Sequence, residues 1–290
     1  MPTFPAPRPL TVVVDRLAAR VHVVASERDD AVVTVLPANP GRASDGRAAQ
    51  ETRVELTGDV LTVSGPTTLR HLVIGPQGMV TVTVEVPAGS GVAGTLAAGP
   101  LYTEGPLGAV DVKLSAGDAS VEHAARIDLR SSAGSVVVGT VTGPTTVRSS
   151  AGSVRIRSVL GDATVRSSAG DVTVGSVTGS LTVTGAHGEI VVGRVRGTVE
   201  ATTGSGGIRV DSLDSGVATL QTSYGSVEVG VPEGTAAWVD ASTQFGQVRN
   251  RLTPSDAPSD DAATAELHVT TSYGDVVVRR PESTSPFTGV

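Results

Sequence analysis

The chain has 290 residues and a formal net charge of −7; it is rich in glycine, and aromatic side chains make up 2% of it. The negative charge disfavours general nucleic-acid binding, which needs a basic surface to displace counterions from phosphates. The lack of cysteine excludes disulfide bonds and thiolate metal sites. Abundant valine and scarce aromatic rings favour β-strands around a thin aliphatic core.

The first 90 residues read as a set of β-strands. Five apolar runs predict strands, at residues 10–14, 20–25, 31–36, 54–56 and 60–63. The first three favour a meander or hairpin, and the last two flank a Thr-Gly-Asp turn that favours a second hairpin. The polar loop between these groups leaves room for a short helix near residues 45–52. Residues 79–86 read M-V-T-V-T-V-E-V, the strongest strand signal in the chain.

From residue 99 onward the sequence repeats. The signature R-S-S-A-G-[SD]-V begins at Arg130, Arg148 and Arg166, which are 18 residues apart. A marker glycine precedes each V-x-V run, at positions 99, 117, 134, 152, 170, 188, 206, 225, 246 and 274. A fixed period of this length is typical of stacked supersecondary units. The intervals lengthen after residue 206, so we expect insertions in the last repeats.

Apolar residues recur two, four and seven positions after the marker glycine, as in Val172, Val174 and Val177. The step from four to seven breaks the period of two that a strand imposes, so we expect about three short strands per repeat. One repeat cannot bury its apolar face alone, whereas stacked repeats can. We therefore predict an all-β fold: a single-stranded, right-handed parallel β-solenoid (β-helix) with coils of about 18 residues and an N-terminal β cap.

The predicted domain organisation has three parts. Residues 1–90 form an N-terminal β-strand cap region, residues 91–280 form the solenoid repeat domain, and residues 281–290 form a disordered tail. Because both ends of a solenoid expose strand edges, we expect the irregular repeats around Trp238 to cap the second end.

Motifs for catalysis are weak. Residues 89–94 match G-x-G-x-x-G, but no helix pattern follows to receive a pyrophosphate, so a glycine-rich corner is the favoured interpretation. The histidines lack metal-ligand spacing, and the acidic residues Asp162, Asp171 and Glu189 are scattered among turns. We expect no enzyme activity, no metal and no cofactor.

Arginines form one candidate binding column, because Arg130, Arg148 and Arg166 occupy equivalent repeat positions. Stacked like charges repel, so the column is either a solvated face, which we favour, or a strip that attracts anions.

A second candidate column is the residue just before the marker glycine. It is alanine in the early repeats and becomes Tyr224, Phe245 and Tyr273 in the last ones. This column is either a corner stack that shields the end of the core or a contact patch for a partner, since aromatic residues dominate interface hot spots.

The chain resembles a bacterial family of β-strand-repeat proteins known as putative adhesins, a domain of unknown function also called Toastrack. The motifs that carry the resemblance are F-x-x-P-x-P-L-x-V at residues 4–12, the S-A-G-[SD]-V repeats, A-A-W-V-D-x-x-T-x-F-G-x-V-R-N at residues 236–250 and T-S-Y-G-D-V at residues 271–276. The resemblance implies the fold and no catalytic residues. Relatives found beside envelope-stress and membrane-anchored regulatory modules imply scaffolding or sensing.

We therefore expect a non-enzymatic scaffold or protein-interaction module with an unknown protein partner, linked to envelope or signalling complexes. A cell-surface adhesin or carbohydrate-binding protein is the alternative, and a carbohydrate-active β-helix enzyme is the second alternative. No apolar run reaches the roughly 18–20 residues that a membrane span needs. The N-terminus lacks a basic segment followed by an apolar one, so we expect a cytoplasmic protein. The sequence predicts no oligomeric state.

Overall fold

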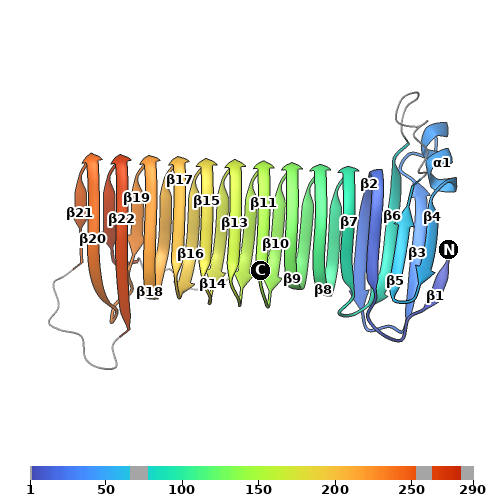
Figure 1. Ribbon diagram of the computed structural model, residues 1–290, viewed down its shortest axis with the longest axis horizontal. Coiled ribbons are helices and arrows are strands. Elements are labelled where there is room, and N and C mark those ends of the chain that lie inside the picture. The colour runs from blue at the N-terminus through green and yellow to red at the C-terminus, as the bar shows by residue number, and fades with distance from the viewer. Residues whose placement is uncertain (1, 66–77, 253–262, 282–290) are drawn as a thin grey trace. The chain divides into compact units, whose positions relative to one another are not determined.

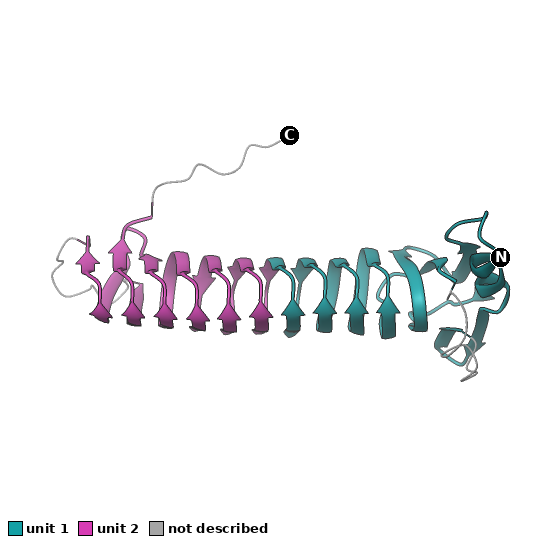
Figure 2. Ribbon diagram, turned by 90° about the horizontal axis from the view of Figure 1, so that it is seen from above, with its two compact units in different colours: residues 1–156 teal, residues 157–290 magenta. Residues whose placement is uncertain are grey.

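The computed structural model describes residues 2–65, 78–252 and 263–281, and this part of the chain is all-β with one short helix. It forms two compact units, Met1–Ile156 and Arg157–Val290, which Figure 2 shows in separate colours. Both have the β-solenoid-like architecture that the repeat predicted, because parallel strands from successive repeats lie side by side. Most of the predicted tail lies outside the described residues.

The elements of the first unit, in chain order, are β1 (Thr3–Pro5), β2 (Thr11–Ser26), β3 (Asp30–Pro37), α1 (Ala43–Gln50), β4 (Arg53–Thr57), β5 (Val60–Ser64), β6 (Val80–Pro87), β7 (Gly91–Ala98), β8 (Leu101–Ala116), β9 (Ala119–Ala133), β10 (Val136–Val141) and β11 (Thr145–Ala151). The chain passes into the second unit within β12 (Val154–Val159). The second unit continues with β13 (Ala163–Ala169), β14 (Val172–Val177), β15 (Leu181–His187), β16 (Ile190–Arg196), β17 (Val199–Ser205), β18 (Ile208–Tyr224), β19 (Val227–Gly230), β20 (Ala236–Phe245), β21 (Val248–Asn250), β22 (Thr264–Tyr273) and β23 (Val276–Arg279).

Two parallel ladders organise the first unit (Figure 1). In one ladder, residues 11–18 of β2 pair with β7, and the order continues through β8 and β9 to β11. In the other, residues 21–24 of β2 pair with β8, and the order continues through β9 to β10. The long strands β2, β8 and β9 therefore take part in both ladders.

Antiparallel pairing ends these ladders at the N-terminal side of the unit. Strands β5 and β6 pair with β2 in parallel, whereas β4 pairs with β5, and β3 with β6, in the antiparallel sense. The predicted hairpin of β4 and β5 and the predicted helix, α1, are confirmed. The predicted meander or hairpin of the first three runs is wrong, because one strand, β2, spans Thr11–Ser26 and β6 lies between β2 and β3. The predicted domain boundary after residue 90 falls between β6 and β7 and stays a prediction.

The second unit has the same arrangement of two ladders. One runs in the order β13, β15, β17, β18, β22 and β20, and the other in the order β14, β16, β18, β19, β23 and β21. The last strands of the chain, β22 and β23, thus lie between β18–β19 and β20–β21 instead of at the outer edge. Strand β20 is the outermost strand of its ladder among the described residues.

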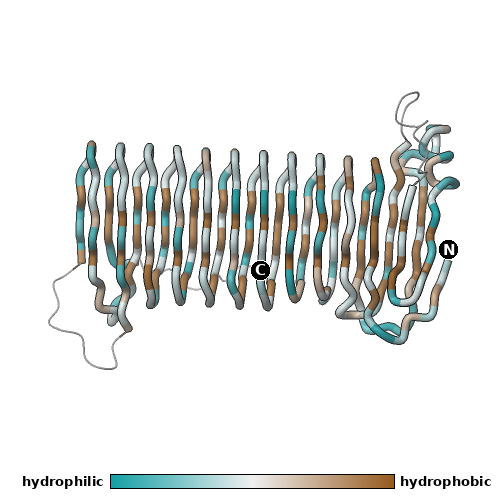
Figure 3. The backbone as a smooth tube through the Cα atoms, in the orientation of Figure 1, coloured by the Kyte–Doolittle hydropathy of each residue, from teal (hydrophilic) through white to brown (hydrophobic). Residues whose placement is uncertain are grey.

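Valine, leucine and isoleucine columns fill the space between the two ladders, and apolar and polar residues alternate along the strands in Figure 3. Each repeat contributes two strands rather than the three predicted, as β14 and β15 illustrate. The pairing of β14 with β16 passes over Gly175 and resumes at Ser176, which shifts the alternation by one residue. Val174 and Val177 are therefore both buried within a single strand.

The marker glycines form corners that tolerate no side chain. Gly206 has φ of +142°, a region that favours glycine, and a Cβ atom there would lie 2.0 Å from the carbonyl oxygen of Gly188 in the neighbouring repeat. The close approach of the two backbones at the corner therefore explains why glycine recurs at this position.

We predict that Gly206→Ala lowers the free energy of unfolding by about 2 kcal/mol or more, because the new methyl group meets backbone and φ is unfavourable. The control is Gly185→Ala, where the nearest atom to a new Cβ is the Thr203 hydroxyl oxygen at 3.3 Å and φ is not in the positive region. Urea unfolding compares the two variants, and equal shifts in midpoint would contradict the corner argument.

We also predict that Val174→Asp, at a position that is 0% exposed, costs several kcal/mol because it buries an unpaired charge. Thr173→Asp on the outer side of the same strand is the control and is expected to change little. An unchanged melting temperature for Val174→Asp would refute the inward orientation of this column.

Candidate functional site: an exposed aromatic strip

Three aromatic rings stack at the corner where β18, β22 and β20 end. Tyr273 lies between Tyr224 and Phe245, with centroid distances of 4.9 and 4.8 Å and interplanar angles of 5° and 8°. Their exposed fractions are 59% for Tyr224, 45% for Tyr273 and 62% for Phe245. We call these three residues the aromatic strip.

The strip is a direct consequence of the parallel register. Tyr224 pairs with Tyr273 across β18 and β22, and Phe245 pairs with Tyr273 across β20 and β22. Neighbouring strands lie about 4.7–4.9 Å apart, so identical positions place rings at stacking distance. Such ring pairs contribute about 0.5–1.5 kcal/mol beyond their buried area, which holds the rings in one orientation without a partner.

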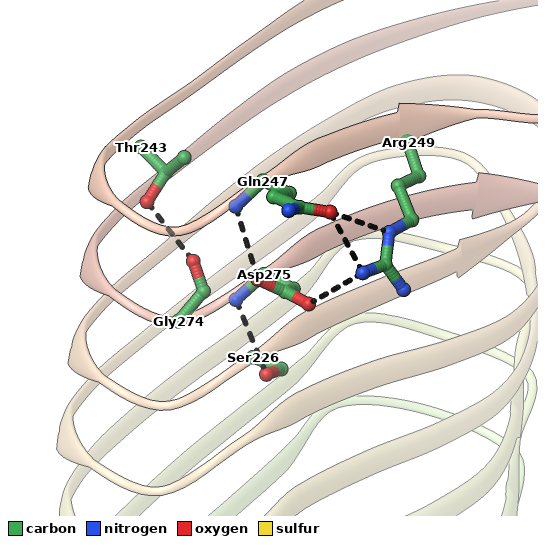
Figure 4. A network of polar contacts seen from close by, with 6 residues as sticks. All are labelled: Ser226, Thr243, Gln247, Arg249, Gly274 and Asp275. Carbon is green, nitrogen blue, oxygen red and sulfur yellow. Dashed lines mark hydrogen bonds and ion pairs between the residues drawn. The ribbon is translucent and has the colours of Figure 1, made fainter.

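A polar network fixes the corner directly after the strip (Figure 4). Asp275 accepts a hydrogen bond from the Gln247 backbone N–H at 3.0 Å, and its other carboxylate oxygen lies 3.6 Å from the Arg249 guanidinium. Arg249 also donates two hydrogen bonds to the Gln247 side-chain oxygen, at 2.8 and 3.1 Å. The Asp275 N–H donates in turn to the Ser226 hydroxyl at 3.3 Å. These contacts tie together the three turns that follow Tyr224, Phe245 and Tyr273.

Threonine hydroxyls support the same corner from the buried side. Thr222 donates to the carbonyl of Gly206 at 3.0 Å, Thr271 to that of Gly225 at 2.9 Å, and Thr243 to that of Gly274 at 2.9 Å. Each bond joins a strand end to the marker glycine of a neighbouring repeat. The backbone that carries the strip is therefore held both by its ladder and by side chains.

The arginine column has a different environment. Arg130 and Arg148 pair in register in the first unit, and Lys113 extends the row on β8. Asp128 lies 2.9 Å from Arg130 and 3.6 Å from Arg148, so a carboxylate offsets part of the repulsion. Arg166 lies in the second unit, on β13. This neutralisation favours the solvated-face interpretation over an anion site.

The acidic turn residues have structural roles. The carboxylate of Asp171 accepts the backbone N–H of Glu189 at 2.9 Å, and that of Asp162 accepts the N–H of Ser180 at 2.8 Å. Residues 89–94, the G-x-G-x-x-G match, lead into strand β7 rather than a helix. No group of three or more histidine, aspartate or glutamate residues within the described ranges is arranged to hold a metal ion.

The shifted pKa values belong to ion pairs and to one buried arginine. A hydrogen bond from Arg28 lowers the pKa of Asp30, and hydrogen bonds to Asp30 and Glu85 raise the pKa of Arg28. A hydrogen bond to Asp211 raises the pKa of Arg209, and burial lowers the pKa of Arg16. The ion pairs favour the charged forms, whereas acid–base catalysis needs groups poised near neutrality.

The sequence identified the three rings but not their order in space. Tyr224 and Tyr273 both stand in the sequence T-S-Y-G, whereas Phe245 stands in T-Q-F-G. This match was the available signal that the first two are direct neighbours. Lys113 was missed because its repeat lacks the R-S-S-A-G signature.

We predict that Asp275→Ala opens the corner locally, because the Gln247 N–H loses its acceptor, at a cost of about 1 kcal/mol. Hydrogen exchange at the Gln247 amide measures this opening, since end repeats open before the core does. Asp275→Asn is the matched control, because its amide oxygen can still accept the bond. If the two variants exchange equally fast, the network does not hold the corner through that N–H.

Comparison with known proteins gives a family and no assigned activity. The model of the family described as Toastrack DUF4097 matches residues 12–279. No curated protein matches the chain. None of the described helices has the length and apolar character required to cross a membrane.

Several solved structures are similar over most of their length. A protein of Bacteroides fragilis named a putative adhesin is 11% identical, with a TM-score of 0.44 and coverage of 96% of this chain and 95% of the other. A Parabacteroides distasonis protein named a putative lipid binding protein is 10% identical, with a TM-score of 0.43 and coverage of 97% and 96%. A putative adhesin of Parabacteroides merdae is 14% identical, with a TM-score of 0.39 and coverage of 96% and 94%. On the family match, which spans nearly the whole chain, the protein belongs to the Toastrack DUF4097 family.

Proposed function

We propose that this protein is a non-enzymatic interaction module that binds a partner protein through the aromatic strip. The observation that carries the proposal is the exposure of three stacked rings on a corner that is held by hydrogen bonds on both sides. Aromatic side chains that are already ordered lose little conformational entropy on binding. Rigid aromatic anchors of this kind are typical of interface hot spots.

Aromatic residues are scarce in this chain, which makes their position informative. The whole sequence has three tyrosines, three phenylalanines and one tryptophan. Four of these seven lie on the neighbouring strands β18, β20 and β22, namely Tyr224, Trp238, Phe245 and Tyr273. A corner stack that only shielded the core could use aliphatic residues, as the rest of the fold does.

The framework that we propose for this module is a right-handed parallel solenoid with coils of about 18 residues. Registers within each unit support the coil length, since Val147 pairs with Leu129 and Val183 pairs with Val165. The right-handed sense is the one that parallel connections adopt almost always. A framework of this kind presents equivalent positions in rows and needs no catalytic cleft.

The experiment replaces all three rings by serine and compares the variant with Tyr102→Ser, which alters an exposed tyrosine on β8 in the other unit. Each immobilised protein is exposed to extract from the native cell, and the retained proteins are quantified. A partner that binds the native protein and Tyr102→Ser is then purified. We expect the triple-serine variant to bind it at least about 30-fold more weakly, the effect of losing one strong hot spot.

A partner that binds the triple variant as tightly as the native protein would overturn the assignment of the strip. Because the rings form two stacked pairs, their replacement should lower the free energy of unfolding by about 1–3 kcal/mol. A urea titration of each variant verifies that it remains folded under the conditions of the binding assay. Cytoplasmic location is part of the proposal, and cell fractionation tests it.

A cell-surface adhesin or carbohydrate-binding protein is the second candidate, and the names of two similar structures as putative adhesins favour it. Recovery of the chain outside the cell, together with glycan binding that is lost in Tyr224→Ala or Tyr273→Ala, would select this candidate over the first.

A further inference from the structure

A second surface, which combines an exposed indole with carboxylates and an imidazole, lies on the outer face of β20 and β22. Trp238 pairs across the strands with Glu266, and Asp240 pairs with His268. The next residues along each strand, Val239 and Leu267, point the other way, toward the core, where Leu267 is fully buried. We call Trp238, Asp240, Glu266 and His268 the indole–carboxylate patch.

Contacts within the patch order its side chains. His268 Nε2 lies 2.9 Å from Glu266 Oε1, and His268 Nδ1 lies 3.7 Å from Asp240 Oδ2. The imidazole meets the Trp238 indole edge to face, with ring centroids 5.3 Å apart and an angle of 62°. The indole is 57% exposed, so much of it is free to meet a ligand.

Several acidic side chains elsewhere in the fold pair with guanidinium groups, whereas those of the patch pair with an imidazole. Asp128 lies against two arginines, as does Asp214, and Glu228 pairs with Arg279. In the patch, the group that the structure places within ion-pair distance of Asp240 and of Glu266 is His268. Two exposed carboxylates therefore lie on the same strand pair as an exposed indole, and no arginine among the described residues forms an ion pair with either of them.

We propose that the indole–carboxylate patch binds an organic ammonium group, primary or quaternary. An indole attracts a cation placed over its ring face, and it does so better than the other aromatic side chains. The two neighbouring carboxylates add attraction for a positively charged ligand and none for a neutral ligand. This inference rests on the outer face of β20 and β22, and it does not depend on the partner proposed for the aromatic strip.

The chain offers a direct readout, because Trp238 is its one tryptophan. Tetramethylammonium chloride is titrated into the full chain while indole fluorescence is recorded, with sodium chloride at the same ionic strength as the reference. We expect a saturable change with tetramethylammonium and no saturable change with sodium. A signal that is equal for the two salts would overturn the proposal.

Carboxylate variants test the electrostatic part. The double variant Asp240→Asn/Glu266→Gln keeps the shapes and is expected to weaken the apparent affinity at least about fivefold. Glu122→Gln is the matched control, because Glu122 is an exposed carboxylate 3.8 Å from His123 on β9, outside the patch. Unchanged binding in the double variant, or equal weakening in the control, would refute the role of the patch.

Trp238→Leu tests the indole, with ligand-observed NMR of the tetramethylammonium methyl signal as the readout. We expect the contact seen with the native protein to disappear, while the unfolding midpoint in urea stays within the spread of the other surface variants. A methyl signal that still reports binding would place the ligand elsewhere and overturn the assignment.

Three further probes identify the source of the ammonium group. Choline represents a lipid headgroup, glucosamine represents an amino sugar, and N-acetylglucosamine is the neutral counterpart of the latter. We expect choline or glucosamine to bind more tightly than N-acetylglucosamine. The ligand with the lower dissociation constant, choline or glucosamine, indicates whether the ammonium group comes from a lipid headgroup or from an amino sugar. Equal binding of glucosamine and N-acetylglucosamine would show that the surface recognises the sugar ring rather than the positive charge, which would contradict the proposal.

Discussion

The fixed distance between parallel strands is the constraint on which this structure depends. Hydrogen bonding keeps neighbouring strands about 4.8 Å apart, and the repeat brings equivalent residues into register. Equivalent side chains in successive repeats therefore lie at that distance from one another, whether their interaction at this distance is favourable or unfavourable. At the corner, only glycine is compatible with this distance, because the backbone of Gly206 lies so close to that of Gly188 that no Cβ atom fits between them.

Different side chains respond differently to stacking at this distance. Valine columns gain burial, and aromatic rings gain a stacked contact, as Tyr224 and Tyr273 illustrate. Like charges lose energy, so the paired arginines Arg130 and Arg148 share the carboxylate of Asp128. The same geometry therefore stabilises an exposed aromatic column, whereas a charged column depends on counter-charges. For this reason we favour the aromatic column over the arginine column as the binding site.

The sequence predicted the parts of the fold that follow from period and composition. It predicted correctly the all-β class, the β4–β5 hairpin, the helix α1 and the inward column containing Val174. It did not predict two other features of the fold. Burial at both Val174 and Val177 suggested a strand break, although a local shift at Gly175 within one strand produces the same spacing. Long-range strand order was also hidden, because β22 pairs with β18 although β20 comes before it in the sequence, and β20 lies at the outer edge of the ladder.

The aromatic residues of the outermost strand, β20, are placed for contact with another molecule rather than for covering the core. An open end of a core exposes whatever apolar residues face it. The core-facing residues of β20 are small or medium-sized: Ala237, Val239 and Ala241 lie opposite Ala265, Leu267 and Val269 of β22. Capping therefore requires no large apolar group on β20. Yet the outer positions of that strand carry Trp238 and Phe245, each more than half exposed. Phe245 gains a stacked contact with Tyr273, but Trp238 and Phe245 both leave more than half of their surface in water. Because contiguous exposed apolar surface marks interaction sites in soluble proteins, we propose that these two rings serve a contact rather than the core.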